Sequence, residues 1–326
     1  MLPIAMLTGA SIYLIYHIMP EPVHKAGPVL DVAVSLLQPF LIFSMLFLTF
    51  CRIEPKDLKP HRWHWWLLMI QGGLFTALGL LAVWVIKVFP GAYHDKLVLI
   101  ESGMLCLICP TATAAAVVTR KLGGDVPGIT TYVVLINILA ALLVPLIVPM
   151  LHPVEGMDFW TAFSKIMAKV FPLLITPCLC AWIVRYMAPK AHRWLMRYPD
   201  FPFYLWAVAL TLAITVTTKS IVNSTISFRL LLLMALVSLI CCIFQFAAGR
   251  FVGSRYRPRS YSPKAEQRGR EIRKVTAGQA LGQKNTVFAI WMAYTFMIPE
   301  TAIIGGLYSI WHNFYNSWQL YRAGEK

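Results

Sequence analysis

Two stretches decide the fold of this chain: Cys109-Pro110-Thr111-Ala112-Thr113-Ala114-Ala115-Ala116 and Gly278-Gln279-Ala280-Leu281-Gly282-Gln283-Lys284-Asn285. Each lies inside an apolar segment, and each contains residues that a lipid-facing helix does not favour. Pro110 removes a backbone donor, and Lys284 brings a charge into hydrocarbon. A lysine near the bilayer centre costs about 2.5–3.5 kcal/mol on insertion scales. Contacts of this lysine within the protein or with a ligand must therefore offset this cost.

The composition indicates a membrane protein. Of 326 residues, 58% are apolar and 13% are charged, and the mean hydropathy is +0.65. These values leave too few charged side chains to cover a soluble globule. We therefore predict an all-α membrane protein, a single transporter domain over residues 1–326, with ten transmembrane helices at 2–19, 28–50, 65–89, 97–119, 127–151, 159–187, 203–222, 228–249, 273–297 and 299–319.

The net charge of +15 is concentrated on one side of this ten-helix arrangement. Of the 29 Lys and Arg residues, 21 fall on that side, in segments 51–63, 120–125, 185–200, 250–274 and the C-terminus. The positive-inside rule makes this side cytoplasmic, with both termini inside. We expect 250–274 to be a basic cytoplasmic loop beside anionic lipid headgroups in the inner (plasma) membrane. The basic composition then requires no nucleic-acid partner.

The two interrupted segments, predicted helices four and nine, also indicate an internal repeat. Their midpoints, Ala115 and Gly282, lie about half a chain length apart. Five helices per repeat is an odd number, so the repeats, about 1–151 and 159–326, are predicted to be inverted. In transporters such breaks meet near the bilayer midplane and form the binding site. A plain proline kink and tight glycine packing are the alternative interpretation.

These segments resemble the bile acid:sodium symporters and their bacterial relatives. Cys109-Pro110, Thr113-Ala114 and the turn Gly123-Gly124-Asp125 are similar to that family's helix four, and Gly282-Gln283-Lys284-Asn285 is similar to its Gly-x-Gln-Asn in helix nine. The resemblance implies a panel domain of helices one, two, six and seven. It also implies a core domain of the other six, in which broken helices four and nine cross. Alternating access between the two domains is then the expected mechanism.

The chain departs from the family at the sodium ligands. Sodium-coupled members are implied to carry oxygen ligands at the positions of Ala115, Ala116 and Ala280, and a glutamine at that of Lys284, beside a helix-three glutamine matched by Gln71. Methyl groups offer sodium no oxygen. We therefore expect no metal site and no cofactor, doubt a role for sodium, and interpret Lys284 as a built-in surrogate cation.

Three roles are open to Lys284: a permanent charge for a substrate carboxylate, a titrating group that couples transport to protons, or a structural ion-pair partner. Its candidate charge partners are Glu101 and Asp125. Thr130 and Asn137 are predicted either to line a polar cavity or to form hydrogen bonds between helices. The predicted binding crossing comprises Gln71, Thr111, Thr113, Ala115, Ala116, Gln283, Lys284, Asn285 and Thr286.

The predicted function is secondary transport of a small or amphipathic organic anion. A sodium-coupled, bile acid-like symporter and a non-transporting sensor of the same fold are the alternatives. An enzyme is disfavoured because the chain has no HExxH, GxSxG or paired intramembrane carboxylates. The expected partners are the anion and the lipid bilayer, and the sequence does not set an oligomeric state.

Overall fold

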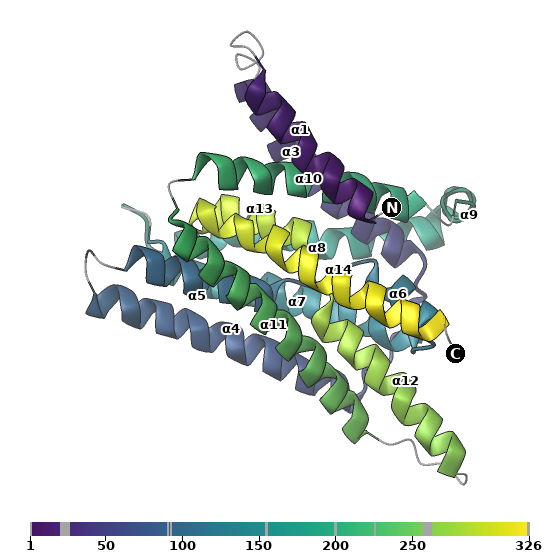
Figure 1. Ribbon diagram of the computed structural model, residues 1–326. Coiled ribbons are helices and arrows are strands. Elements are labelled where there is room, and N and C mark those ends of the chain that lie inside the picture. The colour runs from purple at the N-terminus through teal and green to yellow at the C-terminus, as the bar shows by residue number, and fades with distance from the viewer. Residues whose placement is uncertain are drawn as a thin grey trace.

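The computed structural model describes residues 2–19, 27–89, 91, 93–153, 156–198, 201–224, 226–256 and 263–324. Throughout these residues every named element is a helix, which confirms the all-α prediction (Figure 1). The first half of the chain holds α1 (Leu2–Ile18), α3 (Gly27–Cys51), η1 (Pro55–Asp57), α4 (Arg62–Val88), α5 (His94–Ile108), α6 (Ala115–Lys121) and α7 (Val126–Leu151). The second half holds α8 (Phe159–Met187), α9 (Pro189–Met196), α10 (Phe201–Asn223), α11 (Phe228–Arg255), α12 (Pro263–Gly282), α13 (Thr286–Phe296), η2 (Pro299–Ala302) and α14 (Ile303–Gly324).

Among the described residues, 6 helices are long and apolar enough to cross a membrane: α3, α4, α7, α8, α10 and α11. The apolar parts of α1 and α13 are shorter, at Ile4–Ile18 and Thr286–Phe296. Several long apolar helices thus agree with a multi-pass membrane protein. The full count of ten transmembrane helices stays a prediction.

Both interrupted segments are broken helices. The predicted helix 97–119 ends at Ile108 and begins again at Ala115, and the predicted helix 273–297 ends at Gly282 and begins again at Thr286. Pro110 explains the first break, because proline has no N–H and disfavours a helical conformation at the residue before it. Asn285 explains where the second half-helix begins, since its side chain accepts a hydrogen bond from Phe288 N at 3.2 Å as an N-cap.

The long helices pack around these breaks, and the contact of α7 with α8 joins the helices of the two sides of the bundle. α10 contacts α1 and α3, and α3 also contacts α8. α4 packs on α5 and α7, and α11 packs on α5, α12 and α14. In Figure 1, α1, α3 and α10 lie along one side of the bundle and α4, α5 and α11 lie along the opposite side. α1 begins and α14 ends at the same end of the bundle, which we call the terminal end.

The predicted basic loop at 250–274 is largely helical, so that prediction is wrong in its extent. α11 continues to Arg255 and α12 begins at Pro263, while 257–262 lies outside the described residues. Arg270 Nε donates to Ser254 O at 3.1 Å and Arg273 Nη1 donates to Tyr256 O at 3.1 Å, which joins the two helix ends. Arginine, lysine and glutamate are good helix formers, so a helix need not end where its apolar sequence ends.

Candidate functional site

The two helix breaks meet and pair with each other. Thr111 and Lys284 form an isolated antiparallel bridge, in which Ala112 N donates to Gln283 O at 3.2 Å and Asn285 N donates to Pro110 O at 2.8 Å. Backbone groups that lost their helical partners at the breaks thus find partners across the crossing. Such pairing is required inside a bilayer, where water cannot satisfy them.

Thr111 adds a side-chain contact to this backbone pairing. Its hydroxyl donates to Ala280 O at 2.6 Å, which lies in the last turn of α12. Thr111 is fully buried, so the hydroxyl acts inside the crossing and not toward open space. The predicted crossing residues Thr111, Gln283, Lys284 and Asn285 are therefore brought together by the structure.

Lys284 covers the carboxyl end of half-helix α5. Its ammonium Nζ donates to Leu107 O at 3.1 Å, and the residue is only 2% exposed. The last carbonyls of a helix have no partner within it and carry partial negative charge. The lysine therefore places its positive charge where the α5 dipole favours a cation.

Other donors of the chain cover the neighbouring carbonyls. Gln71 of α4 donates to Cys109 O at 3.2 Å and accepts from the Tyr132 hydroxyl at 2.8 Å. The Tyr308 hydroxyl donates to Gly282 O, the last residue of α12, at 2.8 Å. Gln71 thus lies at the crossing, where it bonds the same carboxyl end of α5 as Lys284.

The predicted charge partners of Lys284 are wrong. Glu101 is fully buried, lies 2.5 Å from His152 Nε2, and accepts from Ile298 N at 3.1 Å. Asp125 caps α7 by accepting from Gly128 N at 3.2 Å. Glu101 sits about two turns before the end of α5, roughly 10 Å from the crossing along the helix. Over the residues that the structure describes, no ion pair joins Lys284 to a carboxylate.

The alanines at the expected sodium-ligand positions lie in an apolar cluster. Ala115 and Ala280 are fully buried there among Trp63, Ile129 and Tyr132, and Ala116 packs against the cluster. Their methyl groups fill this part of the crossing, where a sodium ion would need oxygen atoms. Ala115 and Ala116 therefore contribute packing and supply no side-chain ligand.

A small cavity lies on the other side of the crossing. It lies between α3 and α10 on one side and the broken helices and α14 on the other, and it is lined by Met45, Ala112, Thr113, Trp206, Leu210, Lys284, Asn285, Thr286, Val287, Ser309, His312 and Asn313. Four predicted site residues, Thr113, Lys284, Asn285 and Thr286, line it. Thr130 and Asn137 are not among the lining residues, and each donates to a carbonyl of its own helix α7, at 2.7 and 2.9 Å.

Three polar residues of α14 were missed by sequence reasoning. The Ser309 hydroxyl lies 2.6 Å from that of Thr286. His312 and Asn313 are 5% and 9% exposed, and the His312 Nδ1 and Asn313 Nδ2 atoms have no hydrogen-bond partner in the described part of the chain. Their spacing of three and four residues, which places side chains on one helix face, was the signal that could have found them. The cavity lining therefore includes buried polar atoms without a partner among the described residues, of which Asn313 Nδ2 is a donor and His312 Nδ1 donates or accepts according to its tautomer.

Comparison with known proteins agrees with this architecture. No curated protein matches the chain. A family model described as the SBF-like CPA transporter family matches residues 5–320, a range that includes both helix breaks and the cavity-lining part of α14. The chain therefore belongs to the SBF-like CPA transporter family, whose members are membrane transporters of the bile acid:sodium symporter type.

Proposed function

We propose that this chain moves a small or amphipathic organic anion by alternating access, without sodium, and that Lys284 takes the place of the coupling cation. The observation that carries the proposal is the contact of 3.1 Å between Lys284 Nζ and Leu107 O. A positive charge is thus built into the crossing at the carboxyl end of α5. A mobile cation is not needed to balance that end.

The surroundings of Lys284 argue against a sodium ion beside it. Two carbonyls that could otherwise bind a cation already accept hydrogen bonds: Cys109 O from Gln71 and Gly282 O from Tyr308. The apolar cluster with Ala115 and Ala280 supplies no further oxygen from side chains. Since sodium binds through a cage of oxygens, this crossing is poorly suited to it.

The cavity suits an anion. Lys284 lies at its wall, and α13 begins there, with the positive end of its dipole toward the cavity. His312 Nδ1 and Asn313 Nδ2 add polar atoms that have no partner among the described residues. Met45, Trp206 and Leu210 face these groups across the cavity and suit an apolar portion of the same ligand. The lining therefore matches the chemistry of a carboxylate with an apolar body, for which the small cavity would have to widen.

The arrangement of helices supports a panel that moves against a core. α1, α3, α8 and α10 form the proposed panel, the broken helices with α4, α7, α11 and α14 form the proposed core, and the contact of α7 with α8 joins the two. The two breaks occupy corresponding places in two halves of the chain, as five-plus-five inverted repeats require. The clustered Lys and Arg residues favour cytoplasmic termini in the plasma membrane.

Uptake into proteoliposomes tests the proposal. Labelled mono- and dicarboxylates and a bile acid are offered with an inward sodium gradient or with potassium in place of sodium. We expect equal uptake in both, and a loss of about tenfold or more in Lys284→Met, because the positive charge is gone. Lys87→Met, which removes an exposed lysine at the end of α4, is the matched control and should transport normally.

Three outcomes would contradict parts of the proposal. Uptake that rises steeply with sodium would favour the alternative function, a sodium-coupled symporter. Binding of an anion without flux would favour the sensor. A pH dependence that Lys284→Met abolishes would make Lys284 the proton-coupling group instead of a fixed cation.

A further inference from the structure

The short helix α9 runs in a different direction from the long helices. A proline disfavours a helical conformation at the residue before it, so α8 ends at Met187 and Ala188 caps both α8 and α9. Pro189 then begins α9, at a position where an N–H would have no partner within the helix. In Figure 1, α9 is seen nearly along its axis at the terminal end, whereas the long helices lie across the view. This is the orientation of a helix that lies along a membrane surface.

One face of α9 holds the helix against the bundle. His192 Nε2 lies 2.7 Å from Cys51 O at the end of α3, and Leu195 and Met196 pack against the main hydrophobic core. His192 lies three and four positions before these two residues, so all three share one face of the helix. Tertiary contacts therefore fix α9 in its position.

The opposite face of α9 presents three cations around a tryptophan. Lys190, Arg193, Trp194 and Arg197 also recur at spacings of three and four residues, and all four are exposed, Trp194 by 61%. Arg197 directly follows α9 and keeps helical backbone angles. Within the described ranges of the chain, none of the three cations forms an ion pair with a carboxylate. We call these four residues the α9 basic face.

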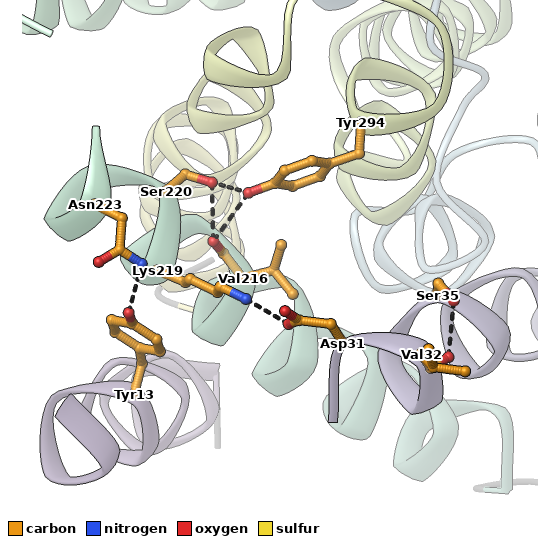
Figure 2. Close-up of polar contacts among 9 residues, drawn as sticks. All are labelled: Tyr13, Asp31, Val32, Ser35, Val216, Lys219, Ser220, Asn223 and Tyr294. Carbon is orange, nitrogen blue, oxygen red and sulfur yellow. Dashed lines mark hydrogen bonds and ion pairs between the residues drawn. The ribbon is translucent and has the colours of Figure 1, made fainter. Parts of the chain in front are cut away.

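Other cations of this protein do find carboxylates. At the end of the bundle opposite the terminal end, Lys219 of α10 pairs with Asp31 of α3 (Figure 2). Close to α9 itself, Arg185 of α8 donates to Glu54 at 2.6 Å. The exposed charges of the α9 basic face are therefore available to a partner outside the chain.

The α9 basic face adjoins the lipid-facing surface of α8. Leu179, Ile183 and Met187 are spaced four residues apart on α8, and all are exposed in a helix that is apolar enough to cross a membrane. Met187 ends this apolar stripe two residues before α9 begins. The hydrocarbon therefore ends where α9 begins, and α9 lies at the level of the lipid headgroups. Tryptophan is enriched at this level because its ring is amphipathic.

We infer that the α9 basic face binds the phosphate groups of anionic lipids in the leaflet beside the terminal end. Lys and Arg at a membrane surface attract anionic headgroups, and the positive-inside rule makes this side cytoplasmic. Trp194 enters the boundary between headgroups and hydrocarbon, which a soluble acidic protein would not offer. The inference goes beyond the proposed function, since its ligand is a lipid and not the transported anion.

Lipid binding measured by native mass spectrometry tests the inference. The purified protein is offered an equal mixture of phosphatidylglycerol and phosphatidylcholine, whose headgroups differ in charge. We expect the wild type to bind phosphatidylglycerol at least tenfold more tightly. In Lys190→Gln/Arg193→Gln/Arg197→Gln, the affinity for the most tightly bound phosphatidylglycerol should fall at least tenfold, because each cation contributes roughly fivefold. Lys190→Gln alone, which should weaken binding about fivefold, repeats the test with a smaller change.

A matched variant removes the same charge at the opposite end of the bundle. Lys87→Gln/Lys165→Gln/Arg229→Gln replaces three exposed cations of α4, α8 and α11, and it should bind phosphatidylglycerol as the wild type does. Trp194→Leu should weaken binding several-fold, whereas Trp84→Leu, at an exposed tryptophan of α4, should not.

Three results would overturn the inference. They are equal affinity of the wild type for both lipids, an equal loss of affinity in the matched variant, and displacement of the lipid by excess inorganic phosphate. The last result would identify a soluble phosphate as the ligand. Because lipid binding is measured without any transport, absence of anion uptake would contradict the proposed function alone.

Discussion

The crossing has two sides, which differ in whether their polar groups find hydrogen-bond partners within the described residues. On the carbonyl side, the carbonyls of Leu107, Cys109 and Gly282 each accept a hydrogen bond from a side chain of this chain. On the cavity side, His312 and Asn313 are buried with polar atoms that lack a partner among the described residues. The three carbonyls of the first side are therefore already hydrogen-bonded in the folded protein. The second side offers polar atoms to the proposed ligand, so we expect stability and binding to depend on different sides of one site.

Charge reversal at Lys284 should cause the largest loss of stability on the carbonyl side. Lys284→Glu would place a carboxylate against Leu107 O at the negative end of α5, where both the dipole and burial oppose it. We expect loss of folded protein, with a cost of about 3–5 kcal/mol, as for other buried charges left without a partner. Size-exclusion chromatography and thermal unfolding in detergent measure this effect.

Lys284→Gln is the matched control for that reversal. Its amide can still donate to a carbonyl, so we expect folded protein that has lost the charge and about tenfold or more of the uptake. A folded, transporting Lys284→Glu variant would show that the ammonium does not serve the α5 carboxyl end.

The sequence predicted the two breaks but not all of their surroundings. Pro110 and Lys284 violate the rules for a lipid-facing helix, so the breaks were visible in the local sequence. Glu101 does not reach Lys284 because the helix rise places it well before the break. Only the tertiary structure, in which α4 packs on both α5 and α7, brings His152 to Glu101. Pairing between distant segments is a tertiary property that a single sequence does not encode locally.

The cavity residues show a different limit. Ser309, His312 and Asn313 form a polar stripe on α14 that the sequence displays, yet nothing in it says which helix the stripe faces. The contact of α10 with α14 decides this, since it brings Leu210 and Trp206 opposite the stripe. Conversely, the basic residues at 250–274 suggested a loop, because charge marks the end of a membrane span more clearly than the end of a helix.

Gln71 offers a milder test of the carbonyl side. Gln71→Leu removes the donor to Cys109 O and the acceptor for Tyr132, and both groups stay buried. Leaving such groups without partners costs about 1–3 kcal/mol. We expect a lower unfolding temperature together with reduced uptake. An unchanged unfolding temperature would mean that the carbonyl side is not the stabilising half of the crossing.

On the cavity side, a substitution should lower uptake without lowering stability. His312→Leu removes a buried polar atom that has no partner among the described residues, so stability should stay equal or rise. Uptake should fall about tenfold, the effect of losing about 1.4 kcal/mol of binding. Asn316→Leu is the control on the same helix: Asn316 accepts from Gln279 at 3.1 Å, so its loss should lower stability by about 0.6 kcal/mol.

Sodium itself should have the smallest effect of all. An ion that binds only the folded protein with a dissociation constant of about 10 mM would add about 1.4 kcal/mol of stability at about 100 mM. Here Lys284 and Gln71 already donate to the carbonyls at the end of α5, and the alanine cluster provides no side-chain oxygen. Replacing sodium by potassium at constant ionic strength should therefore leave the unfolding temperature unchanged. A sodium-specific rise that persists in Lys284→Met would place an ion elsewhere in the crossing, whereas a rise that appears only in Lys284→Met would show that the ammonium had occupied its site.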